Sequence, residues 1–210
     1  MTNLTRWLRC LACIPLAVTA QAQAPAPCTT ATPACTEWVT SPSGPGRLLV
    51  YRSHALTRPN AAITRAFILV HGAGRDAHNY YRHALAAAFL AGTLENAIVI
   101  SPRFASNDGR SCEDSLAPGE ANWGCGGPGR WTAGGASSGS ASLTSFDITD
   151  DLLRALARKD LFPNLSAIVI GGHSAGGQFA QRYAMANQVH EKLGVPVTYI
   201  VSNPSSYAYL

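Results

Sequence analysis

The chain has 210 residues, of which 47% are hydrophobic and 13% are charged, and its formal net charge is +4. This composition excludes an intrinsically disordered protein, and the length suits one hydrophobic core rather than two full domains. Because the charge is small and the basic residues are scattered, the sequence gives no support for a nucleic-acid partner.

The N-terminus has the pattern of a secretory signal peptide. Two arginines precede an apolar stretch from Cys10 to Ala20, which is too short to span a bilayer. Small residues follow this stretch and predict cleavage near Ala22 or Ala24. We therefore expect a signal peptide at residues 1–22, a secreted or periplasmic mature protein, and no stable membrane anchor.

Four cysteines remain after the expected cleavage: Cys28, Cys35, Cys112 and Cys125. An even number of cysteines in an exported chain predicts disulfides, and local pairing, Cys28 with Cys35 and Cys112 with Cys125, is the simplest of three connectivities. No C-x-x-C motif remains in the mature chain, so we expect no metal site of this kind.

Residues 23–45 form a linker rich in proline, alanine and threonine, together with the first turn. Two β-like stretches, Glu37–Thr40 and Arg47–Arg52, flank the turn at residues 41–46 and predict a hairpin. We place the main domain at residues 46–210.

Short apolar runs and helical patterns alternate through this domain. The runs are continuous rather than alternating, as expected for strands buried on both faces of a parallel sheet. They are Ala66–Val70, Ala97–Ser101, Ala167–Ile170 and Val197–Ser202. Helices are predicted at Ala77–Ala91, Ser145–Lys159 and Ala175–Gln188. This order predicts an α/β fold with a mostly parallel, doubly wound sheet.

Residues 103–143 interrupt the alternation. The segment is rich in glycine, contains two cysteines and two tryptophans, and shows no periodicity. A loop of this length in a compact domain is usually a lid or a binding surface. Trp123 and Trp131 are therefore candidate substrate contacts, with a purely structural role as the alternative.

Gly172-His173-Ser174-Ala175-Gly176 matches the G-x-S-x-G motif of a nucleophilic serine. An apolar run precedes it and a helical pattern follows, which is the strand–turn–helix context that this motif requires. Residues 135–139 also match the motif, but no apolar run precedes them, so we take that match as accidental. Ser174 is the predicted nucleophile.

A second motif lies about a hundred residues upstream, where a buried strand runs into His71-Gly72-Ala73-Gly74. Acyl transfer needs two backbone N–H groups directed at the oxyanion. We expect one from Ala175, directly after the nucleophile, and the other from Ala73 or Gly74.

Neighbouring polar residues are given structural roles. His71 is expected to shape the oxyanion loop, and His173 to pack locally. Arg75 and Asp76 are expected to form a salt-bridged turn, with substrate contact as the alternative.

Together the two motifs resemble those of the α/β-hydrolase superfamily, over residues 46–210. Within that superfamily the chain is similar to secreted esterases, lipases and polyester depolymerases. The resemblance implies a carboxylesterase- or lipase-like activity on a small-molecule or polymeric ester, through an acyl-enzyme on Ser174 and with no metal or organic cofactor.

The resemblance also implies a catalytic acid and then a histidine after the nucleophile. Only His190 and Glu191 follow Ser174 as suitable groups, in the reverse order, and we interpret them as solvated surface. The expectation is therefore a hydrolase domain that lacks its last strands and helices, or one whose catalytic residues have been lost. A peptidase or amidase of the same fold and a non-catalytic binding module stay open as alternatives.

Overall fold

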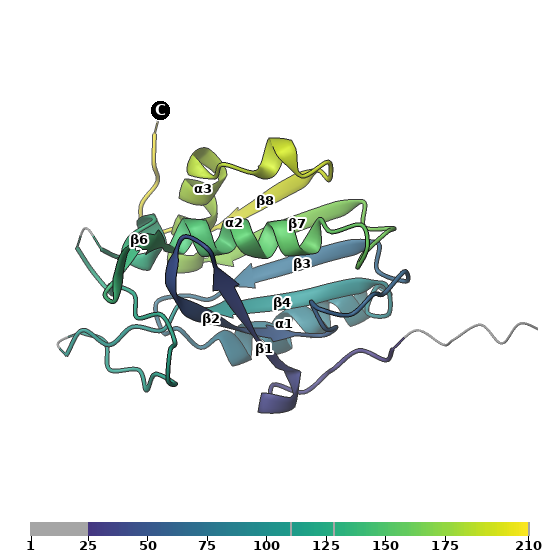
Figure 1. Cartoon of the computed structure of the whole chain (residues 1–210), viewed down its shortest axis with the longest axis horizontal. Helices are drawn as coiled ribbons and strands as arrows, with labels where there is room; N and C mark the ends of the chain where they lie inside the picture. The colour runs from purple at the N-terminus through teal and green to yellow at the C-terminus, as the bar shows by residue number, and fades with distance from the viewer. Residues whose placement is uncertain (1–24, 110, 128, 210) are drawn as a thin grey trace, which may run out of the picture.

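The computed structural model describes residues 25–109, 111–127 and 129–209 (Figure 1). The predicted signal peptide at residues 1–22 lies outside the described residues. In the described ranges, no helix combines the length and the apolar character that crossing a membrane requires.

A six-stranded sheet forms the centre of the fold, in the order β1-β2-β4-β3-β7-β8 (Figure 1). Its strands are β1 (Thr36–Ser41), β2 (Gly44–Arg52), β3 (Arg65–Val70), β4 (Ala97–Arg103), β7 (Ala167–His173) and β8 (Val197–Ser202). The last four strands in the spatial order are parallel, while β1 and β2 form the predicted antiparallel hairpin at one edge. The α/β prediction is confirmed.

The continuous apolar runs became strands because the central strands bury both of their faces. In β3, Ile68 joins the larger hydrophobic cluster on one face of the sheet, while Phe67 and Leu69 pack with the smaller cluster on the other face. In β4, Ile98 and Ile100 face the larger cluster and Val99 faces the smaller one. Successive side chains therefore serve opposite layers, as the pleat of a strand requires.

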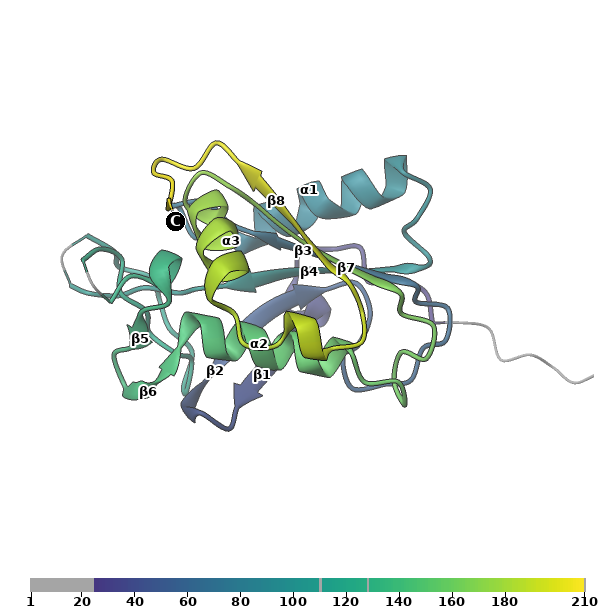
Figure 2. The same cartoon turned by 90° about the horizontal axis from the view of Figure 1, so that it is seen from above.

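Three helices cover the two faces of the sheet (Figure 2). Tyr81 and Leu85 of helix α1 (Ala77–Leu90) pack in the smaller cluster. Helices α2 (Ser145–Leu156) and α3 (Ala175–Ala186) lie on the opposite face, where they contribute to the larger cluster. Short 3-10 helices occur at η1 (Pro33–Cys35), η2 (Trp131–Ala133) and η3 (His190–Lys192).

A capping box begins helix α2. The Asp147 backbone N–H donates to Thr144 Oγ1 at 3.1 Å, and the Thr144 backbone N–H donates to Asp147 Oδ2 at 3.0 Å. These two bonds satisfy amide groups that have no partner inside the helix. The helix ends at Leu156, before the predicted end at Lys159.

Both local disulfides are present, Cys28–Cys35 and Cys112–Cys125. The first one holds a segment that packs against the domain, although we expected an extended linker there. Tyr81 of α1 donates its hydroxyl hydrogen to the Cys28 carbonyl, and the Cys28 N–H donates to the Ser53 carbonyl. Residues from Cys28 onward therefore belong to the folded unit.

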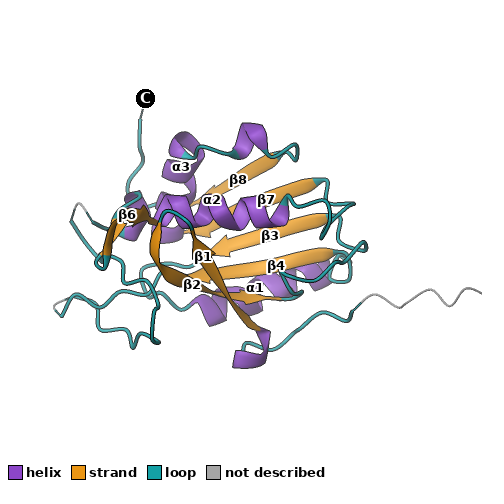
Figure 3. Cartoon of the chain, in the orientation of Figure 1, coloured by secondary structure: helices purple, strands orange, loops and turns teal. Residues whose placement is uncertain are grey.

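Residues 103–143 contain structure that the sequence did not predict. Strands β5 (Ala136–Ser137) and β6 (Ser140–Thr144) form a small antiparallel hairpin, and loops make up most of the remaining segment (Figure 3). β5 has only two residues, and β6, with the sequence SASLT, has one large apolar residue, so neither has a hydrophobic pattern to detect. The second G-x-S-x-G match, residues 135–139, lies in this hairpin and no helix follows it there, which agrees with its interpretation as accidental.

We expect Thr144→Ala to lower the free energy of unfolding by about 1 kcal/mol, because the first turn of α2 loses its cap. Urea denaturation followed by circular dichroism measures this change. Thr57→Ala is the matched control, because Thr57 is exposed in a turn. An equal loss in both variants would contradict the assigned role of the cap.

Candidate active site

Ser174 lies between the end of β7 and the start of α3, in a strained backbone conformation with φ 57° and ψ −119°. Its backbone N–H donates to the Ser202 carbonyl at 3.0 Å, and its carbonyl accepts from the Gln178 N–H at 3.0 Å. The side chain is half-buried, and its hydroxyl has no hydrogen-bond partner among the described residues. Ser174 is therefore held rigidly through its backbone while its Oγ stays free.

Close backbone contacts explain both glycines of the motif. A Cβ atom on Gly172 would collide with the Gly176 carbonyl, and a Cβ on Gly176 would collide with the carbonyls of Val70 and His71. Any larger residue at either position would push the first turn of α3 away from β3. The spacing of the motif thus follows from the packing of α3 on the two central strands.

The loop after β3 lies beside Ser174 because β3 and β7 are parallel neighbours, with Val70 opposite Gly172. Ala73 in this loop and Ala175 at the start of α3 line the same cavity. Within the described part of the chain, neither backbone N–H donates a hydrogen bond. Gly74, the other predicted donor, is exposed and does not line the cavity.

This cavity has a volume of about 230 Å³ and lies at the carboxyl ends of the parallel strands, where open α/β sheets bind their ligands. Arg130, Thr132 and Gln178 also line it, and no sequence motif indicates any of them. Gln178 was detectable in principle, because it lies one helical turn after Ser174. Arg130 carried no signal, since it follows a glycine-rich stretch without periodicity.

A larger cavity, of about 410 Å³, lies around Ser53, His54 and Asn60. Ser53 is bonded to Ala97 and Val99 at the amino end of β4. The cavity is therefore at the other end of the sheet from Ser174. Size alone does not identify a functional site, and the smaller cavity, at the carboxyl ends of the strands, is the candidate.

His71 is a buried structural residue. Its Nδ1 lies 2.9 Å from the Gly72 carbonyl, and its Nε2 accepts a hydrogen bond from the Phe104 backbone N–H at 3.0 Å. This pair of bonds requires the neutral tautomer with hydrogen on Nδ1. Burial lowers the pKa of the imidazole to about 4. His71 therefore links the loop after β3 to the start of the 103–143 segment, and both ring nitrogens are occupied.

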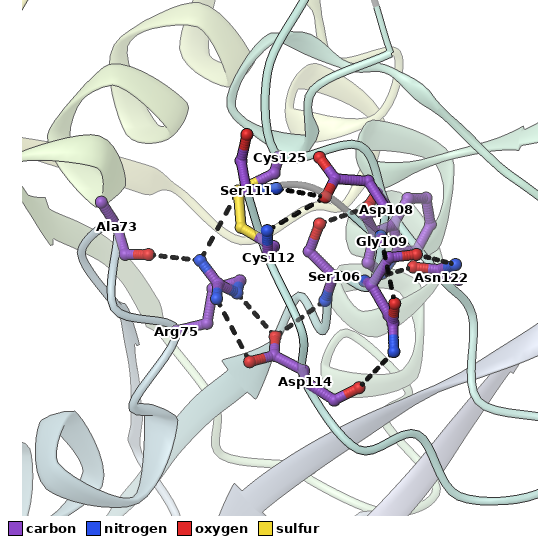
Figure 4. Close-up of a disulfide and its surroundings, with 12 residues drawn as sticks. Ala73, Arg75, Ser106, Asp108, Gly109, Ser111, Cys112, Asp114, Asn122 and Cys125 are labelled. Atoms are coloured by element: carbon purple, nitrogen blue, oxygen red, sulfur yellow. Dashed lines mark hydrogen bonds and ion pairs between the residues drawn. A yellow bond between two sulfur atoms is a disulfide. The ribbon is translucent and has the colours of Figure 1, made fainter.

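Arg75 connects the loop after β3 to the Cys112–Cys125 loop (Figure 4). It pairs with Asp114 through two bonds, at 2.6 and 3.2 Å, and donates to the Ala73 carbonyl at 2.6 Å. We expected Arg75 to pair with Asp76, and this prediction is wrong, because the observed partner is Asp114. Burial alone would raise the pKa of Asp114, but the bonds from Arg75 and from the Ser106 N–H hold it below its usual value.

The two tryptophans occupy different environments. Trp131 lines the cavity, stacks on Phe104 with ring centroids 5.3 Å apart, and lies 4.7 Å from the His71 ring. Trp123 is buried behind it, edge-on to Phe104, and does not line the cavity. Its position is that of a core residue.

His190 and Glu191 lie beyond the far end of α3, in η3. Helix α3 has twelve residues, and it is therefore about 18 Å long. His190 Nδ1 is 2.7 Å from the Asn187 side-chain nitrogen and 3.4 Å from the Tyr199 hydroxyl. It is thus half-buried rather than solvated, while Glu191 is exposed as expected.

Two carboxylates of the 103–143 segment form ion pairs with arginines. Besides Asp114, Glu120 is buried and accepts two bonds from Arg103, at 2.8 and 3.0 Å. Within the described ranges, no three histidine, cysteine or acidic side chains form a group able to hold a metal ion.

The sequence pattern of the alpha/beta hydrolase family matches residues 67–207. This range includes the loop after β3, the Ser174 turn and β8. The chain therefore belongs to the alpha/beta hydrolase family. A search of curated proteins found no match.

Similar solved structures include a poly(aspartic acid) hydrolase-1 from Sphingomonas sp. KT-1, at 18% identity and a TM-score of 0.42, covering 70% of this chain and 50% of that one. A poly(3-hydroxybutyrate) depolymerase from Bordetella parapertussis has 18% identity and a TM-score of 0.43, covering 69% and 43%. An esterase from Pyrobaculum calidifontis has 20% identity and a TM-score of 0.37, covering 71% and 38%. The chain thus spans half or less of the length of each.

We expect Gly176→Ala to lower the free energy of unfolding by about 3 kcal/mol or more, because its methyl group meets two backbone carbonyls that cannot move aside. Thermal and urea denaturation measure this loss. Gly139→Ala, in the accidental match, is the control, since open space surrounds that position. A Gly176→Ala protein as stable as the control would contradict the close packing of α3.

We expect His71 to make stability depend on pH. The unfolded chain protonates this residue near its usual pKa of 6.5, whereas the folded protein does so only near 4. The stabilisation is therefore complete above pH 6.5 and falls by about 3 kcal/mol as the pH drops to 4. Urea denaturation across this range measures the slope.

His71→Gln should remove this part of the pH slope, whatever its effect on absolute stability. His83→Gln, at an exposed position of α1, should leave the slope as it is in the original protein. The assignment is overturned by a slope that survives in His71→Gln.

Proposed function

We propose that the protein is a serine hydrolase that cleaves carboxylic esters through an acyl-enzyme on Ser174. The observation that carries the proposal is the free Ser174 hydroxyl on a strained turn, directly before Ala175, which lines a cavity together with Ala73. The backbone N–H groups of these two residues are unused in the described structure. Membership of the alpha/beta hydrolase family supports a hydrolase.

In the proposed reaction, Ser174 Oγ attacks the ester carbonyl carbon and loses its proton to a general base. The negative charge that develops on the carbonyl oxygen accepts hydrogen bonds from the N–H groups of Ala175 and Ala73. The amino end of α3 adds a favourable dipole. The C–O bond to the alcohol then breaks, the base returns the proton to the departing alcohol, and water releases the acid from the acyl-enzyme.

The proposal assigns no general base. His71 is unsuitable, because it is buried, neutral and bonded through both nitrogens. His190 is unsuitable, because α3 separates it from Ser174.

We also propose that the protein acts outside the cytoplasm. The expected signal peptide and the two disulfides support this location. The substrate of the protein would be a small-molecule or polymeric ester.

We expect a fluorophosphonate probe to label the protein at Ser174, because such probes phosphonylate an activated serine. The measurement is made on the protein isolated from the cells that produce it. Peptide mass spectrometry locates the label. Ser174→Ala should lose the label completely, and Ser137→Ala, at the serine of the accidental match, should keep it.

Labelled protein is then compared on p-nitrophenyl butyrate and the matching p-nitroanilide, since esterases and amidases share the same nucleophile. We expect turnover of the ester and at least a hundredfold slower turnover of the anilide. An unlabelled Ser174 would favour the non-catalytic binding module, and faster cleavage of the anilide would favour the amidase.

A further inference from the structure

The cavity beside Ser174 is lined by a positively charged side chain that the protein does not neutralise. Arg130 lines the cavity, and its Nε atom is buried with no hydrogen-bond partner. No carboxylate in the described structure forms an ion pair with it. An unsatisfied nitrogen of a charged group is costly to bury, and such groups usually have a partner or a ligand.

Arg182 of α3 adds a second positive charge next to the first. Its guanidinium donates to the Thr132 carbonyl at 3.1 Å, to Gln178 Oε1 at 3.0 Å and to the Ser206 hydroxyl at 2.9 Å. All three acceptors are neutral. Burial and the nearby charge of Arg130 lower the pKa of Arg182, as expected where two like charges lie close together.

The other arginine that lines the cavity behaves differently. Arg75 is neutralised by Asp114, which binds it through both carboxylate oxygens. The remaining polar lining residues, Thr132, Gln178 and Ser205, are uncharged. The wall of the cavity at Arg130 is therefore positive, with no internal counter-charge. Arg182, which is bonded to the lining residues Thr132 and Gln178, adds positive charge from behind this wall.

We propose that this wall binds a carboxylate group of the substrate, and that the preferred substrates are esters that also carry a free carboxylate. Arg130 is the specificity-determining residue, and Arg182 supports it through charge. This inference rests on the proposed ester hydrolysis at Ser174, and it deepens that function by naming the substrate class. The carboxylate can belong to the acid part or to the alcohol part of the ester.

The physical basis is differential binding. A carboxylate in the cavity can pair with the charged guanidinium of Arg130 and reduce the repulsion between the two arginines, while a methyl group of similar size does neither. A charge-assisted hydrogen bond in a partly buried site corresponds to about tenfold or more in affinity. The difference in affinity between charged and neutral esters should shrink as ionic strength rises, because the cavity is open to solvent.

The test measures binding rather than turnover. Isothermal titration calorimetry is carried out on a Ser174→Ala protein, which leaves the esters intact. The ligands are monoethyl glutarate, with the carboxylate on the acid part, 4-acetoxybutanoate, with the carboxylate on the alcohol part, and ethyl valerate, which is neutral. We expect at least one of the two anions to bind about tenfold more tightly than ethyl valerate, and the tighter anion identifies the part that carries the charge.

When Arg130→Gln is introduced into the Ser174→Ala protein, the anion should no longer bind more tightly than ethyl valerate. Arg130→Lys should retain part of this difference in affinity. Arg65→Gln is the matched control, because it removes the same charge at the exposed, opposite end of β3. Circular dichroism confirms that each variant is folded, and if Arg130→Gln is not, the salt dependence of anion binding to the Ser174→Ala protein decides.

Equal binding of all three ligands would overturn the proposal, as would an advantage that survives in Arg130→Gln. Neither outcome depends on catalysis, so failure here is distinct from failure of the labelling experiment at Ser174.

Discussion

The close packing of the first turn of α3 against β3 and β7 is the constraint on which the site depends. Gly172 and Gly176 allow backbone to meet backbone, and the carbonyls of Val70 and His71 occupy the space that any side chain would need. This contact forces Ser174 into its strained conformation. It also brings the loop after β3 to the amino end of α3, so that Ala73 and Ala175 border one cavity. One steric condition thus positions both the hydroxyl and the candidate oxyanion donors.

The central sheet was predictable because its strands are buried on both faces, and Val197–Ser202 was found with its bounds unchanged. The 103–143 segment was not, since its order comes from contacts between distant residues. Arg75 binds Asp114 across a long stretch of chain, although Asp76 is its neighbour in sequence. Hydrophobic periodicity reports on burial by regular elements, and it carries no information about such ion pairs.

The site was predictable to a similar extent. Ser174 could be found because a strand and a helix flank a short motif of small residues, and this context separated it from residues 135–139. The positive charge of the cavity could not be found, because only folding brings Arg182 near Arg130. Both tryptophans looked alike in the sequence, yet only Trp131 reaches the cavity. Composition identifies residues able to bind, whereas topology selects those that line the site.

The order of strands in the sheet also constrains how the chain can fold. β3 lies at the centre, between β4 and β7. It can pair with β4 early, but its pairing with β7 joins Arg65 to Ala167, a separation of about a hundred residues that makes this a slow, high-contact-order step. Until β7 arrives, the backbone groups along one side of β3 have no partner, and they form an edge open to association with other chains. During synthesis the turn that carries Ser174 thus forms in the same step that closes this edge.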